Sequence, residues 1–152
     1  KKDFEKITLQ DNIQGGEKVE FGAIVGNPPY QENSKDTSDK PIYPMFMDLS
    51  HYLSYLVCLI TPARFLFNAG KTDKSWNLKM LNDKHLKVSK YIAKSTDTFP
   101  DVDIKGGLAI TERNKTASFG AIDTFSAFPE LNIILHKVKK SKDFVGLDKS
   151  VV

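Results

Sequence analysis

The chain has 152 residues, 40% of them hydrophobic and 27% charged, which is the composition of a folded domain that buries a core. Its net charge of +3 permits a nucleic-acid partner without requiring one. No apolar run approaches the ~20 residues that span a bilayer, and the first residues are too polar for a signal peptide. We therefore expect no membrane partner. The single cysteine, Cys58, excludes an intrachain disulfide, and the histidines lie too far apart in sequence for a zinc motif, so no metal site is predicted.

The first two thirds of the chain alternate short apolar runs with helical patterns. Phe21–Gly26 is predicted to be a buried strand, because the run is too short for a helix and has no polar face. Apolar residues at three- and four-residue steps predict the first helix. In chain order, the predicted elements are a strand over 21–26, a helix over 42–55, a strand over 56–60, a short helix opened by Pro62, a helix over 76–84 and a strand over 88–93.

The last third of the chain has a different pattern. Two β-like runs, 102–110 and 117–125, flank the polar segment 112–116 and predict an antiparallel hairpin. A final helix with a basic end is expected over 129–142. The whole series indicates an α/β fold with a mostly parallel sheet that ends in an antiparallel hairpin. The elements are too few for a complete doubly wound fold, so we expect part of one.

The segment Asn27-Pro28-Pro29-Tyr30 directly follows the first strand and is the most informative feature of the sequence. The two prolines lack a backbone N–H and restrict the residues before them, so the segment is expected to be a stiff, extended loop. Ligands bind at this end of the strands in open α/β sheets. The Asn27 side-chain oxygen and the Pro28 carbonyl are acceptors, and Tyr30 adds an aromatic face. The groups suit a flat ligand with an amino group, such as an adenine edge; a strand-terminating turn with a core tyrosine is the alternative.

The run Phe21–Tyr30 resembles the catalytic strand and loop of S-adenosylmethionine-dependent amino-methyltransferases. More specifically, it resembles the N6-adenine DNA methyltransferases of bacterial restriction–modification enzymes, fused type IIG forms included. Three further stretches resemble that group: Leu59–Phe65 (the strand and turn after the catalytic helix), Thr98–Pro100 (a loop with a second aromatic) and Asp103–Gly107 (the start of the closing hairpin). The resemblance covers roughly residues 20–125 and implies a partial Rossmann-like methyltransferase fold in a bacterial cytoplasmic enzyme.

The resemblance also implies a cofactor, a partner and a set of catalytic residues. The cofactor is S-adenosylmethionine, which Asn27 is expected to contact, and the partner is double-stranded DNA, from which the target adenine is flipped out. Asn27 and the Pro28 carbonyl accept hydrogen bonds from the adenine amino group, with Pro29 as part of the same catalytic loop. Tyr30 stacks on the base, and Phe99 contacts it from another side. Methyl transfer then depends on positioning and electrostatics and needs no nucleophilic serine or cysteine.

Several residues with a cationic side chain or no side chain are candidates for contacts with DNA. Lys105 and Gly106 are expected to bind substrate, because Lys105-Gly106-Gly107 would let the backbone approach a phosphate; a tight bend in a strand is the alternative. Other cations in predicted loops suit phosphate contacts or simple solvation. These residues are Arg64, Lys71, Lys74, Arg113 and Lys115.

One expected part of the family pattern is missing from the sequence. The family holds the methionine and ribose of the cofactor with a glycine-rich turn and an acidic residue, both before the catalytic loop. Only 26 residues precede Asn27, and they contain Gly15-Gly16 without that pattern. We therefore interpret residues 1–152 as the C-terminal, substrate-side portion of a methyltransferase domain whose upstream cofactor-binding half is absent. The isolated chain is then inactive, and its partners are the remainder of the parent enzyme and, through the face left exposed, a second copy.

Two alternative functions remain open at this stage. Methyltransferases that act on RNA or on protein glutamine carry the same tetrapeptide. The polar loop after Tyr30 and the Asp103–Gly107 stretch favour the DNA group. A non-catalytic DNA-binding or assembly module with a catalytic-looking loop is the other alternative.

Overall fold

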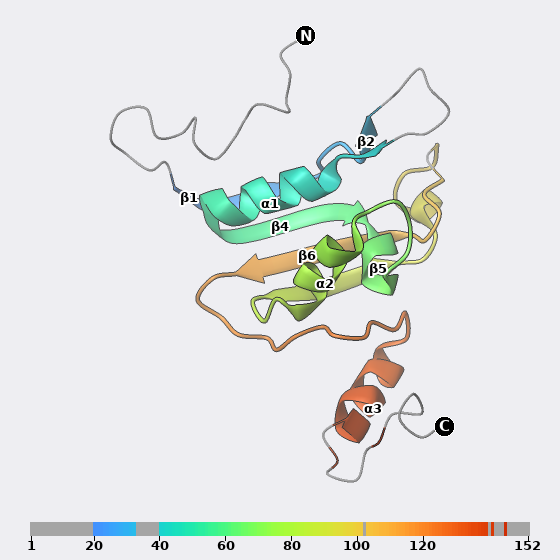
Figure 1. The fold of residues 1–152 in the computed structure, drawn as a ribbon. Helices are drawn as coiled ribbons and strands as arrows, with labels where there is room; N and C mark the ends of the chain where they lie inside the picture. The colour runs from blue at the N-terminus through green and yellow to red at the C-terminus, as the bar shows by residue number, and fades with distance from the viewer. Residues whose placement is uncertain (1–19, 33–39, 102, 140, 142–144, 146–152) are drawn as a thin grey trace.

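A computed structural model describes residues 20–32, 40–101, 103–139, 141 and 145. Four strands form the main sheet in the order β1-β4-β6-β5 (Figure 1), namely β1 (Phe21–Gly26), β4 (Ser54–Pro62), β6 (Leu108–Asn114) and β5 (Leu86–Ile92). β1 pairs with β4 in parallel, whereas β6 runs antiparallel to both β4 and β5. The prediction of a mostly parallel sheet is therefore wrong, because β6 is inserted in the opposite direction between two strands that run the same way. The fold is α/β with a mixed sheet.

The predicted hairpin between 102–110 and 117–125 is also wrong. β6 continues to Asn114, through most of the segment that was expected to turn, and 117–125 is described throughout and contains no strand. The polar residues of β6 fit in a strand because they pair with charges on its neighbours. Glu112 lies 3.1 Å from the Lys87 ammonium, and Arg113 lies 2.7 Å from the Asp83 carboxylate. Residue 102 lies outside the described part of the chain.

The predicted α-helices are confirmed with shifted ends, and none of the described helices is long and apolar enough to cross a membrane. They are α1 (Tyr43–Leu53), α2 (Lys74–Asn82) and α3 (Pro129–Lys139). The short helix expected after Pro62 is a 3₁₀ helix, η3 (Ala63–Phe67), and a second 3₁₀ turn, η4 (Ser95–Asp97), follows β5. The remaining elements are two-residue strands that pair antiparallel, β2 (Gln31–Glu32) and β3 (Lys40–Pro41).

The core lies where α1, α2 and η3 pack against the sheet. The Trp76 ring of α2 contacts Tyr43 of α1 at 6.0 Å and Phe65 of η3 at 5.5 Å between ring centroids, and its indole N–H donates to Asp48 at 3.0 Å. The β4 side chains that face this cluster are Val57, Leu59 and Thr61, which alternate along the strand as the pleat requires. These contacts fix α1, α2 and η3 relative to one another.

The shared direction of β1, β4 and β5 gives the sheet two different edges. We call the edge where these three strands end and β6 begins the carboxyl edge, and the opposite one the amino edge. Asn27–Tyr30, η3 and the segments 93–101 and 103–107 all lie at the carboxyl edge. In open α/β sheets the carboxyl edge is where ligands bind, so the fold places the proline loop there.

Candidate substrate-binding site

The loop Asn27–Tyr30 is anchored at both of its ends. Asn27 follows directly on β1. At the other end, the Tyr30 carbonyl accepts hydrogen bonds from the backbone N–H of Ile42 at 3.1 Å and of Tyr43 at 3.5 Å. The first N–H groups of a helix have no partner within the helix, so Tyr30 supplies one from outside. The loop is therefore tied to both the sheet and α1, and the two prolines stiffen it between these attachments.

The acceptor groups predicted to bind an amino group are accessible. Asn27 is exposed and Pro28 is half-buried. The Tyr30 hydroxyl is buried without a hydrogen bond of normal geometry to a described residue. Burial raises the pKa of Tyr30, and the neighbouring Asn27 side chain lowers it by a smaller amount. The phenol therefore stays protonated beside Asn27.

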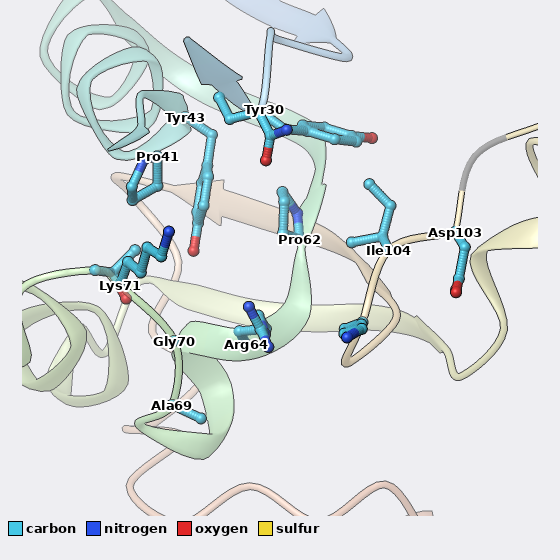
Figure 2. A pocket seen from close by; sticks show the side chains of 13 residues that line it. Tyr30, Pro41, Tyr43, Pro62, Arg64, Ala69, Gly70, Lys71, Asp103 and Ile104 are labelled. Carbon is cyan, nitrogen blue, oxygen red and sulfur yellow. The ribbon is translucent and has the colours of Figure 1, made fainter. Parts of the chain in front are cut away.

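A cavity of about 540 Å³ opens at the carboxyl edge beside this loop. Figure 2 shows Tyr30, Tyr43, Pro62 and Ile104 around it, with Arg64 and Lys71 on the side away from the loop. The lining comes from the proline loop, the first turn of α1, the end of β4, η3, the segment after η3 and the loop before β6. The volume suits a nucleotide-sized ligand.

The charge of the lining is mainly positive. Arg64, Lys71 and Lys105 contribute three cations, against one carboxylate from Asp103. Lys105, which was predicted from the sequence as a substrate-binding residue, is thus part of the lining. Arg64 and Lys105 form no ion pair with a residue that the structure describes. An anionic ligand is favoured here.

Gly106, the neighbouring candidate, lies behind the cavity lining and packs against Arg64. A Cβ at Gly106 would lie 2.7 Å from Arg64 Cγ, and the residue has a φ of +90°. At Gly107 a Cβ would lie 2.3 Å from the Ile92 carbonyl oxygen. The two glycines therefore allow a tight bend at the start of β6.

Phe99, the predicted second aromatic, is at the same edge but outside the cavity lining. It is half-buried in the loop after η4, where its backbone N–H donates to the Ser95 carbonyl at 2.8 Å. The Ser95 hydroxyl accepts from the Ile104 N–H at 2.7 Å, which closes this loop onto itself. The structure brings Tyr30 and Lys105 to one cavity, and the contact of Phe99 with a base stays a prediction.

Sequence analysis did not single out Tyr43 or Pro62 as site residues. Tyr43 looks like an ordinary apolar position of an amphipathic helix, and only the tertiary structure shows that its hydroxyl end reaches the cavity. Pro62 and Arg64 lie in the stretch Leu59–Phe65, whose resemblance to methyltransferases could have indicated both. Of the other candidate cations, Arg113 and Lys115 pair with acids at the amino edge.

The fold and the site together define a class of protein. A stiff acceptor loop at the carboxyl end of a strand, beside a nucleotide-sized cationic cavity, is typical of α/β enzymes that act on nucleotide-like substrates. The chain matches the Eco57I restriction-modification methylase family over residues 1–99, and it belongs to that family. The predicted resemblance to restriction–modification methylases is thereby confirmed.

The name of a similar protein is consistent with this family. The chain is 32% identical over 96 residues to an "Uncharacterized adenine-specific methylase" of Mycoplasma pneumoniae (strain ATCC 29342 / M129 / Subtype 1). The alignment covers 59% of this chain and 22% of the relative, so the chain spans about a fifth of that protein's length. No solved structure matches the chain.

Proposed function

We propose that this chain forms the substrate side of a DNA adenine-N6 methyltransferase of a restriction–modification system that uses S-adenosylmethionine. The family and the printed name of the Mycoplasma relative support a methylase that acts on adenine. The observation that carries the proposal is the position of Asn27–Tyr30. The loop lies at the carboxyl end of β1, anchored to α1, beside a cavity of about 540 Å³.

In this proposal, Asn27 and Pro28 recognise the amino group of the target base. The Asn27 side-chain oxygen and the Pro28 carbonyl each accept one of its two N–H hydrogen bonds. Both acceptors are held rigidly, because the two prolines fix the backbone between them. The interaction draws electron density toward the nitrogen and directs its lone pair out of the ring plane. Transfer would form the bond from this nitrogen to the methyl carbon while the carbon–sulfur bond of the cofactor breaks and its electron pair stays on sulfur. One proton would leave the nitrogen for solvent, so the chain needs no general base of its own.

Tyr30 holds the plane of the base in the same proposal. Its ring lines the cavity, and the raised pKa of its hydroxyl keeps the ring neutral. Base–aromatic stacking contributes about 1–3 kcal/mol per base, which offsets part of the cost of taking the adenine out of the duplex. Phe99 is expected to contact the other side of the base once DNA is bound.

Asn27 is the described residue that we expect to contact the cofactor. Its side chain is exposed at the end of β1, where it reaches a ligand at the carboxyl edge as well as the base. When bound, S-adenosylmethionine supplies an electrophilic methyl group. The residues that hold its methionine and ribose are expected in the upstream half of the domain. β1 is the end strand of the described sheet, and Phe21 and Val25 are 48% and 77% exposed, so we expect that half to pack there.

The cations of the cavity favour DNA or RNA over protein glutamine as the substrate. A glutamine amide would suit the acceptors of Asn27 and Pro28 equally well. However, Arg64, Lys71 and Lys105 suit an anionic polymer. A methyl-transfer assay with duplex DNA, RNA and a glutamine-containing peptide separates these substrates.

The test of the proposal is methyl transfer from labelled S-adenosylmethionine to unmethylated DNA, measured with the full-length gene product and with this chain. We expect label in DNA adenine for the full-length protein. Asn27→Ala should remove it, whereas Asn82→Ala, at an exposed asparagine of α2, should leave it unchanged. Transfer that survives Asn27→Ala would contradict the proposed role of the loop.

A further inference from the structure

Arg64 has a position that the proposed amino-group chemistry does not explain. It belongs to η3 at the carboxyl edge, and it lines the cavity that Tyr30 also lines. Its side chain is exposed and forms no ion pair or side-chain hydrogen bond with a residue in the described part of the chain. A guanidinium that lines a cavity and forms no ion pair there suits an external anion.

Two glycines with left-handed backbones hold the stem of Arg64. A Cβ at Gly70 would lie 3.3 Å from Arg64 Cδ, and one at Gly106 would lie 2.7 Å from Arg64 Cγ. Their φ values are +89° and +90°, which other residues rarely adopt. The aliphatic part of the arginine therefore passes between two backbone segments that have no side chains in its way. A long, flexible side chain is fixed before any ligand arrives, which lowers the entropic cost of binding.

Tyr43 supplies a second polar group to the same part of the cavity. The residue is only 3% exposed, and its hydroxyl forms no hydrogen bond of normal geometry with a described residue. In Figure 2 the ring descends from α1 with its hydroxyl toward the side of the cavity where Arg64 and Lys71 lie. Burial raises the pKa of Tyr43 to about 12, with smaller opposing effects of Thr72 and Arg64. The hydroxyl is therefore protonated at neutral pH and can donate a hydrogen bond to an anionic ligand in the cavity.

We propose that Arg64 and Tyr43 together bind one phosphate of the nucleic-acid backbone, next to the nucleotide whose base stacks on Tyr30. The inference rests on the proposed function, since it takes the substrate to be a nucleic acid. The guanidinium donates to the phosphate oxygens and neutralises their charge, and the Tyr43 hydroxyl donates a further hydrogen bond. Lys105, on the loop before β6, adds positive charge on the same cavity.

The arrangement gives this contact a positioning role. Tyr30 and Tyr43 are linked through the Tyr30 carbonyl, which accepts the Tyr43 backbone N–H at 3.5 Å. A backbone hydrogen bond thus holds the residue that stacks on the base next to the residue that binds the phosphate. A nucleotide held by both has its base and its backbone fixed relative to the acceptors of Asn27 and Pro28. Phosphate contacts of this kind set register and carry no sequence information.

The test measures the affinity of the protein for a short fluorescent DNA duplex by anisotropy at salt concentrations from about 50 to 200 mM, a range over which phosphate contacts dominate. Arg64→Gln should weaken binding about tenfold at low salt and lower the slope of log K against log salt by about 0.9, the value for one duplex phosphate. Arg64→Lys should keep the slope but lose part of the affinity. Tyr43→Phe should weaken binding about threefold without changing the slope.

Matched controls and a double variant sharpen the result. Lys90→Gln removes an exposed cation from the middle of β5, and Tyr55→Phe removes an exposed hydroxyl at the amino edge; neither should change affinity or slope beyond the usual effect of one surface charge. The combined Arg64→Gln and Tyr43→Phe variant should lose less than the sum of the two single losses, because both groups bind the same phosphate. Thermal unfolding of each variant shows whether the fold is intact.

Two outcomes would overturn the inference. The first is a salt slope for Arg64→Gln equal to that of Lys90→Gln, and the second is no binding of the duplex by the unsubstituted protein. A parallel series with 2-aminopurine in place of every adenine distinguishes this result from failure of the proposed function. Equal affinity for the adenine and the 2-aminopurine duplexes would count against the amino-group contacts of Asn27 and Pro28, which belong to the proposed function. The loss of affinity caused by Arg64→Gln should be the same for both duplexes.

Discussion

The charged side chains at the two edges of the sheet differ in whether they form ion pairs within the protein. At the amino edge, Arg113 lies 2.7 Å from Asp83 and Lys115 lies 3.3 Å from Glu20. At the carboxyl edge, Arg64 and Lys105 have no acidic partner among the described residues. Charges that are paired within the protein contribute to its stability, whereas cations left unpaired beside a cavity are available to a ligand.

The buried polar atoms of the side chains also differ between the two edges. Tyr30 and Tyr43 each bring a buried hydroxyl to the carboxyl edge, where the nearby polar side chains are the uncharged Asn27 and Thr72. Among the residues that the structure describes, the amino edge has one buried side-chain atom without a hydrogen bond, Nη1 of Arg113, and the Nε of that residue is already paired with Asp83. Substitutions of exposed polar side chains at the carboxyl edge should therefore reduce activity with little loss of stability, and substitutions of the paired charges at the amino edge should do the opposite.

The largest expected effect is that of Asn27→Ala on methyl transfer. Removal of one preorganised group that interacts with the reacting centre typically lowers kcat by about 100- to 1000-fold. Asn27 is exposed, so the free energy of unfolding should change by less than about 0.5 kcal/mol. Steady-state kinetics and urea denaturation of the same preparation measure both. A large loss of stability in Asn27→Ala would contradict the proposed difference between the two edges of the sheet.

The matching change at the amino edge is Asp83→Asn. Burial raises the pKa of Asp83, but the hydrogen bonds from Arg113 and from the His85 backbone lower it by more, so the carboxylate is ionised in the folded protein. Its removal leaves a largely buried guanidinium unpaired and should cost about 2–3 kcal/mol of stability. Urea denaturation measures this cost. Asp101→Asn, at an exposed aspartate, is the control, and equal stability of the two variants would contradict the account.

The third prediction concerns pH and His51, near the end of α1. Burial lowers the pKa of His51 to about 4, and Arg113 and Lys79 lower it as well, whereas Asp83 and Asp48 oppose the shift. The unfolded chain binds a proton near pH 6.5 and the folded chain near pH 4, so stability should fall as pH decreases through that window. The loss is up to about 3 kcal/mol, at 1.36 kcal/mol per pKa unit.

The variant His51→Gln tests this assignment directly. It should flatten the dependence of the unfolding free energy on pH between 6.5 and 4, measured by urea denaturation at several pH values. The same slope with and without the histidine would mean that another group titrates there.

The smallest expected effect compares three glycines. Gly107→Ala should cost about 2 kcal/mol of stability, since its φ is +74° and the new Cβ would meet the Ile92 carbonyl oxygen. Gly120→Ala has a φ of +85° but nothing within 4 Å, and should cost about 1 kcal/mol. Gly22→Ala has neither problem and should be nearly neutral. Thermal unfolding ranks the three, and a neutral Gly107→Ala would mean that the bend before β6 is not tight.

The sequence predicted the elements that surround the site and missed the way the last strand joins them. Phe21–Gly26 is a strand in both descriptions, because a short apolar run followed by prolines permits little else. The prediction that this strand is buried was wrong, because β1 is the end strand of the described sheet and its side chains are largely exposed. The hairpin was wrong because Glu112 and Arg113 look like turn residues in one dimension. They fit in a strand only because Lys87 and Asp83 lie opposite them, and that requires the third dimension.

The candidate site was predictable to the extent that it depends on local sequence. Asn27–Tyr30 and Lys105 could be chosen from their own segments, and the structure places them at one edge. Arg64 could be chosen only as one of five cations in predicted loops, and Tyr43 could not be chosen at all. Their roles depend on an unpartnered hydroxyl and on two glycines that lie 6 and 42 positions away from Arg64 along the chain.

The measurement that tests the central claim most directly is the identity of the methylated atom. DNA treated with the full-length protein and S-adenosylmethionine is digested to nucleosides, and the products are separated and identified by mass spectrometry. The account predicts N6-methyladenine, present with the unsubstituted protein and with Asn82→Ala and absent with Asn27→Ala. Methylated cytosine, or methyl groups on protein glutamine with none on DNA, would contradict it.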